Sequence, residues 1–417
     1  MTVTGARDAV GDIDGPSLDG IREARERIRG GVKETPCTES LAFADVTEAR
    51  VHLKLESMHR TGSFKERGAL NRLMVAGPEE RARGVITMSA GNHAQALAYH
   101  ARRLGIVATV VMPVVTPLIK VSRTRALGAK VVLHGATLDD SAVEARRRVE
   151  ADGLTLVHPF DDDQVIAGQG TVGLELAEQV PELTTVVVPI GGGGLISGIA
   201  IALESLRPEV RVIGVEPEAA ASARAARDAG ERTVLDSVET MADGVAVKRV
   251  GERTFPLIER FVDDIVTVSE DEIASAIVSM LEQDRIVVEG AGAVGVAALA
   301  TGKVGMSRGD DVAVVISGGN IDLNLMSRII ERGLSADGRV VRLRVRVRDR
   351  PGALARLTQA VATAEGNVLE VYHRRGFADI SVPDVEIVIH METRGREHAA
   401  EIVAALEALG HTVESSF

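Results

Sequence analysis

One lysine in this sequence is a candidate for covalent chemistry. Lys65 lies in RTGSFKERGAL (60–70) and is one of seven lysines among 48 basic residues. A desolvated lysine loses its proton and forms a Schiff base with a carbonyl, which arginine cannot do. Lys65 is therefore a candidate nucleophile, and the alternative is an ordinary charge on a helix surface.

A run of four glycines is a candidate anion site. GGGGL (191–195) lies between a predicted strand at 184–190 and a predicted helix at 195–206. Successive backbone N–H groups in such a loop point toward one anion, and the positive end of the helix strengthens the attraction. A tight turn needs fewer glycines, so the loop predicts a phosphate site. Its spacing fits neither the Walker loop nor the dinucleotide-binding motif.

Two polar stretches lie where α/β proteins place ligands. SAGNHAQ (89–95) follows a predicted strand and opens a helix, where free N–H groups hold carboxylates. ISGGN (316–320) follows another predicted strand. Serine and asparagine at such turns often only cap helices, so each signal alone is weak. An imine-forming lysine and a phosphate-binding loop together are compatible with pyridoxal 5′-phosphate.

The elements that must position these residues alternate along the chain from about residue 20 to 330. Short apolar runs predict strands at 84–88, 107–113, 130–135, 184–190, 210–217 and 310–320. Helical patterns lie between them, which predicts βαβ units and parallel sheets. A break near 150–170 predicts two lobes, the smaller one at roughly 60–155 inserted in the larger.

Composition limits the possible partners and locations. The net charge of −12 argues against a general nucleic-acid or anionic-membrane partner. Cys37 is the only cysteine, which excludes an internal disulfide. Residues 1–17 are polar and acidic, so we expect a disordered lead-in and not a signal peptide. Pro189 and the glycines interrupt the uncharged run at 183–203, which argues against a membrane span and for a cytoplasmic location.

The pattern changes after GLSADG (333–338), which predicts a linker. Residues 340–349 alternate apolar residues with Arg342, Arg344, Arg346 and Arg348, as in a half-buried strand. Later segments complete a βαββαβ, ferredoxin-like order over 339–417. The arginine stripe lacks the aromatic residues that stack RNA bases, so we favour a solvated or partner-covered sheet face.

These motifs resemble those of the threonine dehydratases (threonine ammonia-lyases). That family belongs to the tryptophan-synthase-β type, fold type II, of pyridoxal-phosphate enzymes. SFKERGA, SAGNHAQ, GGGGL and SGGN are similar to the family's lysine, asparagine, phosphate and pyridine-nitrogen motifs, and VEGAGA (288–293) is also typical. The resemblance covers about residues 18–332 and implies a two-lobed α/β fold. The C-terminal part resembles an ACT regulatory domain, with DRPG (349–352) at its first strand-to-helix turn.

The resemblance implies a role for each matching residue. Lys65 would hold the cofactor and act as the catalytic base and acid. The other cofactor contacts would be Phe64, Asn92, Gly191, Gly192, Gly193, Gly194, Leu195 and Ser317. The substrate carboxylate would be held by Ser89, Gly91, Asn92 and His93. Ser222 stands where a relative's acidic metal ligand is expected near Glu216, so we assign no metal site. Glu66 replaces an apolar residue, and we expect little effect.

The implied reaction converts L-threonine to 2-oxobutanoate and ammonia. Ala90 replaces the serine found in related serine racemases, which predicts little racemisation. The ACT domain implies a homodimer or homotetramer and an effector such as isoleucine or valine, as in isoleucine biosynthesis. Three alternatives are a serine or broad serine/threonine dehydratase, a catabolic nucleotide-activated enzyme, and an amino-acid-sensing protein without catalysis.

Overall fold

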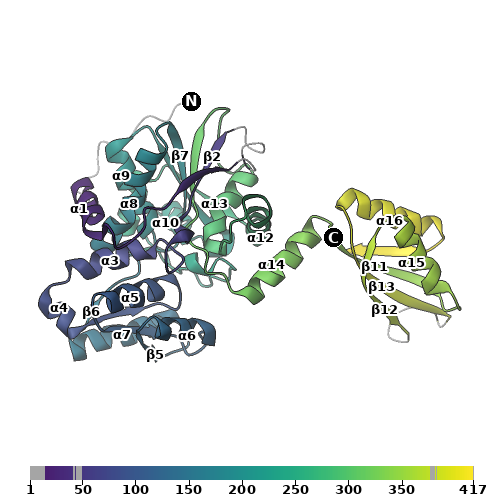
Figure 1. Cartoon of the computed structure of the whole chain (residues 1–417), viewed down its shortest axis with the longest axis horizontal. Helices are drawn as coiled ribbons and strands as arrows, with labels where there is room; N and C mark the ends of the chain where they lie inside the picture. Colours follow the sequence, from purple (N-terminus) through teal and green to yellow (C-terminus); the bar gives the residue numbers. More distant parts are fainter. Residues whose placement is uncertain (1–14, 41–42, 44–48, 376–380, 382, 417) are drawn as a thin grey trace. The chain divides into compact units, whose positions relative to one another are not determined.

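The computed structural model describes residues 15–40, 43, 49–375, 381 and 383–416. The chain forms two compact units, residues 1–321 and 322–417 (Figure 1). Of the expected lead-in at 1–17, residues 1–14 lie outside the described residues. Ser17 caps the first helix, accepting a hydrogen bond from the N–H of Gly20 at 3.1 Å.

The larger sheet of the first unit has the strand order β1-β2-β10-β7-β8-β9. All neighbouring strands are parallel except β1 and β2. The strands are β1 (Cys37–Ser40), β2 (Arg50–Lys54), β7 (Leu183–Pro189), β8 (Arg211–Pro217), β9 (Asp264–Val268) and β10 (Asp311–Val315). Their central members read as continuous apolar runs because helices cover both faces of a parallel sheet.

The smaller sheet has the order β5-β4-β3-β6 and is wholly parallel. Its strands are β3 (Val85–Met88), β4 (Ala108–Met112), β5 (Lys130–Leu133) and β6 (Thr155–Leu156). They fall between β2 and β7 in the sequence, which favours the expected insertion of a smaller lobe. In Figure 1 this sheet and α5 to α7 lie at the lower end of the first unit.

Helices surround both sheets. They are α1 (Leu18–Ile28), α3 (Lys65–Val75), α4 (Pro78–Arg83), α5 (Asn92–Arg103), α6 (Leu118–Ala126), α7 (Leu138–Asp152), α8 (Asp163–Gln179), α9 (Gly194–Leu206), α10 (Ser222–Ala229), α11 (Thr254–Phe261), α12 (Glu270–Ser279) and α13 (Gly290–Ala300). Single-turn elements are η1 (Glu56–Met58), η2 (Glu218–Ala220), η3 (Asp243–Val245) and the π-helical η4 (Met280–Asp284). No helix of the described residues is long and apolar enough to cross a membrane.

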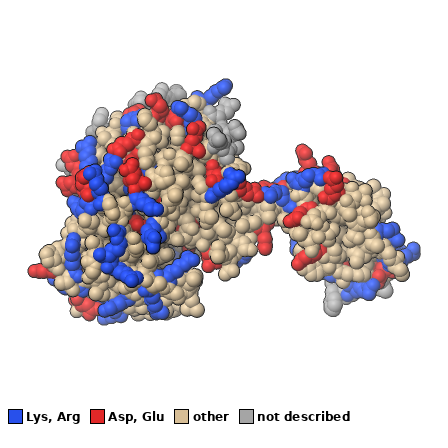
Figure 2. Space-filling view, in the orientation of Figure 1, with Lys and Arg blue, Asp and Glu red and all other residues tan. Residues whose placement is uncertain are grey.

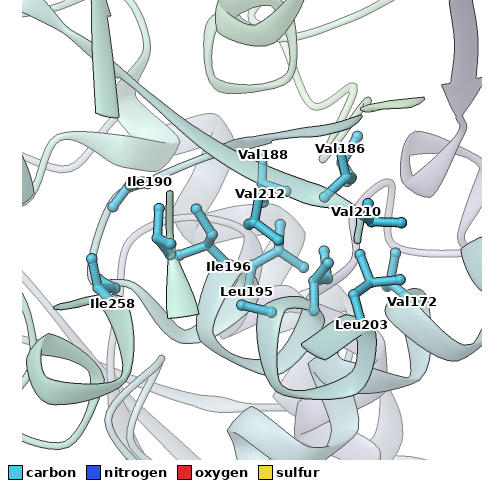
Figure 3. Close-up of a cluster of buried hydrophobic side chains, with 14 of the residues drawn as sticks. Val172, Val186, Val188, Ile190, Leu195, Ile196, Leu203, Val210, Val212 and Ile258 are labelled. Carbon is cyan, nitrogen blue, oxygen red and sulfur yellow. The ribbon is translucent and has the colours of Figure 1, made fainter. Parts of the chain in front are cut away.

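The core that positions the glycine loop lies between β7, β8 and α9. Val186, Val188 and Val212 of the strands pack against Ile196 and Leu203 of the helix (Figure 3). The uncharged run at 183–203 is therefore a buried strand, a loop and a buried helix, as predicted.

Helices α8 and α9 approach each other closely. A Cβ added at Gly198 would lie 2.5 Å from the carbonyl oxygen of Ile166, so glycine is required at this crossing. The start of α9 is held between the sheet and α8.

The second unit contains α14 (Leu323–Ala336) and a βαββαβ domain. The domain's elements are β11 (Val340–Arg348), α15 (Ala353–Thr363), β12 (Asn367–Arg374), β13 (Asp384–Glu392), α16 (Arg396–Ala408) and β14 (Thr412–Ser416). Its antiparallel sheet has the order β12-β13-β11-β14. Val341, Leu343, Val345 and Val347 of β11 are buried and its arginines are exposed, as predicted.

The expected linker at 333–338 is helical over its first four residues. Helix α14 continues to Ala336 because Ile329 and Gly333 form a buried face of the helix. Gly333 lies inside this helix, whereas Gly338 lies in a turn with φ +68°.

Surface charges of the first unit are mixed in sign. Basic and acidic side chains are interspersed on the face shown in Figure 2. Several form exposed pairs, such as Arg25–Glu178 at 2.5 Å and Arg253–Asp163 at 2.9 Å.

Candidate active site

The motifs of the first unit meet in one cavity of about 370 Å³. Its lining includes every residue predicted for the site: Phe64, Lys65, Ser89, Gly91, Asn92, His93, Gly191, Gly192, Gly193, Gly194, Leu195 and Ser317. These residues follow strands of both sheets or begin helices α3, α5 and α9. Parallel strands place their carboxyl ends at one edge, which explains the convergence.

Lys65 is the first residue of α3, and its amine faces the cavity wall. Nζ donates a hydrogen bond to the carbonyl oxygen of Pro159 at 2.7 Å. Burial lowers the pKa of Lys65 to about 8, although the charge of Glu289 opposes the shift. The positive end of α3 also disfavours the ammonium form. Lys65 is therefore suited to act as a nucleophile near neutral pH.

The glycine loop presents unused donors. Among the described residues, none accepts a hydrogen bond from the N–H groups of Gly191, Gly192 or Gly193. Gly193 has φ +93°, and a Cβ at Gly192 would lie 2.2 Å from the ring of Phe160. Free N–H groups at the start of a 13-residue helix form a site for an anion.

The asparagine loop contains a constraint that the sequence did not reveal. Nε2 of His93 bonds to the carbonyl oxygen of Val157 at 3.1 Å, so Nε2 carries the proton. Burial, followed by the charge of Lys65, lowers the pKa of His93 to about 3. The neutral ring therefore has an acceptor at Nδ1, which would repel a carboxylate. His93 can contribute only its backbone N–H at the start of α5.

Ser317 follows β10, where the sequence predicted it. The residue is almost fully buried, and its carbonyl oxygen accepts a hydrogen bond from the N–H of Phe64 at 3.1 Å. This bond ties the residue before Lys65 to the end of the central strand.

Two polar residues of the cavity were not assigned from the sequence. Asn92 donates from Nδ2 to Oε1 of Glu289 at 2.6 Å. Asn320 donates from Nδ2 to Oδ1 of Asn92 at 2.8 Å. The two unassigned residues are Glu289, in VEGAGA, and Asn320, in ISGGN. Both stretches were noted in the sequence, but these polar side chains were given no role.

The segment HPFDD (158–162) was also missed. Phe160 packs on the glycine loop, and Asp161 accepts hydrogen bonds from the N–H groups of Glu252 and Arg253, both at 2.9 Å. These bonds tie the loop that carries Phe160 to the start of α11.

The expectation of little effect from Glu66 needs correction. Glu66 is buried, accepts a hydrogen bond from the N–H of Thr61, and lies 3.3 Å from Nε2 of His100. An apolar side chain would leave the N–H of Thr61 without this acceptor.

Comparison with known proteins identifies the family. The family model of pyridoxal-phosphate dependent enzymes matches residues 28–318, and that of the ACT domain matches residues 341–411. This chain belongs to the pyridoxal-phosphate-dependent enzymes. It is a lyase of fold type II with a C-terminal ACT domain, as predicted.

Three relatives of this pyridoxal-phosphate enzyme bear on its reaction. An L-threonine ammonia-lyase of Thermotoga maritima is 46% identical and spans 95% of this chain and 98% of its own. The catabolic L-threonine dehydratase of Escherichia coli K12 is 43% identical over 75% of this chain and 95% of its own. The processed threonine deaminase isoform 2 of Solanum lycopersicum has a TM-score of 0.72 at 38% identity, over 78% of this chain and 96% of its own.

The residues present fit the cofactor of this enzyme family. The unused N–H groups of the glycine loop are suited to bind a phosphate. Gly192 must be glycine because the ring of Phe160 occupies the space that a Cβ would take. The lowered pKa of Lys65 matches an imine-forming amine.

The region around Glu216 is distinct from this cavity. Glu216 accepts hydrogen bonds from the N–H groups of Ala223 and Arg224 at 2.8 and 2.9 Å. Burial raises the pKa of Glu216 to about 7. Among the described residues, no group of three or more His, Cys, Asp or Glu could hold a metal ion.

Proposed function

We propose that this enzyme deaminates L-threonine by β-elimination and releases 2-oxobutanoate and ammonia. One observation carries the proposal: Lys65, the glycine loop and the asparagine loop share one cavity. The chain that contains this cavity is 46% identical to an L-threonine ammonia-lyase over 95% of its length.

Pyridoxal phosphate supplies a carbonyl for imine formation and a ring that withdraws electrons from the substrate Cα. We assign Lys65 to hold it and then to move the proton at the substrate Cα. A pKa of about 8 leaves a useful fraction of the amine neutral at physiological pH. Phe64 and Asn92 would contact the ring, and the N–H groups of 191–195 would bind the phosphate.

The loop at 89–93 would bind the substrate carboxylate. Ser89 lines the cavity, and its Oγ accepts a hydrogen bond from the N–H of Gly91 at 3.3 Å, a bond that the substrate carboxylate would replace. A Cβ at Gly91 would meet no atom within 4 Å, so this part of the loop borders open space. We assign the backbone N–H groups of Gly91, Asn92 and His93 as donors, with the hydroxyl of Ser89.

Two residues favour elimination over other outcomes. Ser317 would face the ring nitrogen with a neutral hydroxyl, which stabilises a positive charge on that nitrogen less than a carboxylate would. Ala90 lines the cavity and has no proton to deliver to the substrate Cα. We therefore expect dehydration with little racemisation, and D-serine formed from L-serine would contradict this assignment.

The ACT domain supports a regulated enzyme. A cavity of about 340 Å³ at the DRPG turn is lined by Asp349, Arg350 and Arg375. Carboxylate and guanidinium groups together can pair with both charged groups of a free amino acid. We propose isoleucine as an inhibitor, valine as an opposing effector, and a homodimer or homotetramer. This would place the enzyme in isoleucine biosynthesis.

A catabolic role is the second candidate, because the E. coli relative with a catabolic name aligns with three quarters of this chain. Release of 2-oxoacid from L-threonine and L-serine, with and without isoleucine, tests these proposals. Threonine turnover suppressed by isoleucine is the expected result. Threonine turnover that isoleucine does not affect would favour a catabolic role. Faster turnover of L-serine than of L-threonine would change the assigned substrate. Release of no oxoacid from either substrate would refute the proposed reaction.

A further inference from the structure

A buried carboxylate faces the cavity without capping the helix that it precedes. Glu289 is the N-cap residue of α13, and its side chain forms no hydrogen bond to the N–H groups of that helix. Only 4% of the residue is exposed. A buried carboxylate that does not cap its helix requires another reason for its position.

The main chain of Glu289 is fixed on both sides. Its N–H donates to the carbonyl oxygen of Gly318 at 3.1 Å, and its carbonyl oxygen accepts from Gly292 at 2.9 Å. A Cβ at Gly318 would lie 2.2 Å from Oε1 of Glu289, so the space beside the carboxylate is closed. The carboxylate therefore has one well-defined position.

That position controls the amide of Asn92. A carboxylate accepts hydrogen bonds, so the group of Asn92 that faces Oε1 at 2.6 Å must be its NH₂ group. On the other side, Asn320 donates to Oδ1 of Asn92 at 2.8 Å, and also to the carbonyl oxygen of Thr61 at 2.6 Å. The orientation of the Asn92 amide is fixed at both ends, and one N–H remains for the cavity.

The charges near Glu289 come from several elements. Burial, followed by the charge of Asp243, raises the pKa of Glu289 to about 7, whereas Asn92 and Lys120 lower it. The charge of Glu289 in turn raises the pKa of Lys65. Replacement of Glu289 therefore has an electrostatic consequence that can be measured at Lys65.

We propose that Glu289 is a positioning residue that aims one N–H of Asn92 at the hydroxyl oxygen on the ring of bound pyridoxal phosphate. This inference rests on the proposed cofactor role of Asn92. Without the carboxylate, only the bond from Asn320 orients the Asn92 amide, which can then turn its carbonyl oxygen toward the ring hydroxyl oxygen and repel it. Glutamine at 289 retains an acceptor for Asn92, whereas alanine does not.

A double-mutant cycle tests this coupling through cofactor binding. Affinity for pyridoxal phosphate and the visible spectrum of the bound cofactor would be measured for wild type, Glu289→Ala, Asn92→Ala and the double variant. We expect Glu289→Ala to weaken binding about tenfold or more and to shift the spectrum. In the Asn92→Ala background the same replacement should change affinity less than threefold, because the group through which it acts is gone.

Two results would overturn the proposal. One is an equal loss of affinity from Glu289→Ala in both backgrounds, which would mean that Glu289 acts independently of Asn92. The other is a Glu289→Gln variant that binds as weakly as Glu289→Ala, although it is folded by circular dichroism and keeps an acceptor. Threonine turnover by the wild-type enzyme is measured separately. Its failure would refute the proposed reaction and leave the binding cycle informative.

Discussion

Lys120 of α6 and Asp243 of η3 form a salt bridge of 2.5 Å at the cavity that contains Lys65. Helix α6 lies between two strands of the smaller sheet, and η3 lies between two strands of the larger one. The side chains are 27% and 58% exposed, so the pair lies at the rim. It joins a helix beside the smaller sheet to a segment beside the larger sheet at the edge of the cavity.

Replacing Lys120 by alanine should raise KM for threonine about fivefold and change the thermal midpoint little. An exposed ion pair contributes at most about 1 kcal/mol. A free energy of about 1 kcal/mol corresponds to about a fivefold change in a dissociation constant. Steady-state kinetics at low and high salt measures the effect, and wild-type KM should rise with salt. Asp228→Ala is the control, since it removes an exposed pair with Arg224, and neither residue lines the cavity. Equal KM values for wild type and Lys120→Ala would contradict the role.

Gly192→Ala should weaken pyridoxal phosphate binding at least tenfold. The added Cβ would lie 2.2 Å from the Phe160 ring, so either the ring or the loop must move. Gly305→Ala is a matched control, because its Cβ would meet no atom within 4 Å. Cofactor titration followed by absorbance measures both variants. Similar affinities for the two would show that the loop does not bind the cofactor.

Attachment of pyridoxal phosphate to the cofactor-free enzyme should speed up as pH rises to about 8 and then level off. The neutral amine is the reactive form, and burial lowers the pKa of Lys65 to about 8. At pH 7 only about one tenth of the amine is neutral. Stopped-flow absorbance between pH 6 and 9.5 measures the profile. A rate that still rises steeply at pH 9.5 would indicate an unperturbed lysine.

Glu289→Gln should move this midpoint to lower pH. The negative charge of Glu289 raises the pKa of Lys65, and the amide removes that charge. An unchanged midpoint would show that the two groups are electrically independent.

Arg67→Met should destabilise the catalytic unit by about 3–5 kcal/mol. Arg67 is buried and bonds to Glu56 at 2.7 and 2.8 Å and to Glu175 at 2.8 Å. Its removal leaves two buried carboxylates with fewer partners. Thermal unfolding followed by circular dichroism measures the loss.

Arg25→Ala serves as the comparison for Arg67. It breaks a more exposed pair with Glu178, and we expect a loss below about 1 kcal/mol. Similar losses from both replacements would mean that burial of the ion cluster contributes little.

A chain that ends at Ala336 should release 2-oxoacid at the wild-type rate and lose its response to isoleucine. This end keeps all of α14 and removes the βαββαβ domain, which begins at Val340. Activity assays with increasing isoleucine measure the response. Inhibition of the shortened enzyme would place the effector outside the ACT domain.

The sequence predicted elements with local signals better than contacts between distant segments. Strands β3, β4, β5, β7, β8 and β10, the glycine loop and the positions of Lys65 and Ser317 follow from patterns within about ten residues. Strands β1, β2, β6 and β9 were not predicted. The bond between Asn92 and Glu289 spans 197 positions, and no local pattern specifies it. His93 was assigned to the carboxylate through its motif, but its ring orientation depends on Val157 of another segment. The helical start of the predicted linker could not be seen in the sequence, because a glycine inside a helix gives the same one-letter signal as a glycine in a turn.

The order of strands in the larger sheet has a consequence for biosynthesis. β10 lies between β2 and β7, yet it is the last strand of that sheet to leave the ribosome. Until it emerges, β2 and β7 each have an unpaired edge, and Ser317 and Asn320 are not yet available to the cavity. The nascent chain therefore cannot complete either its sheet or its cofactor site until the catalytic unit is almost fully translated. Pyridoxal phosphate must enter afterwards.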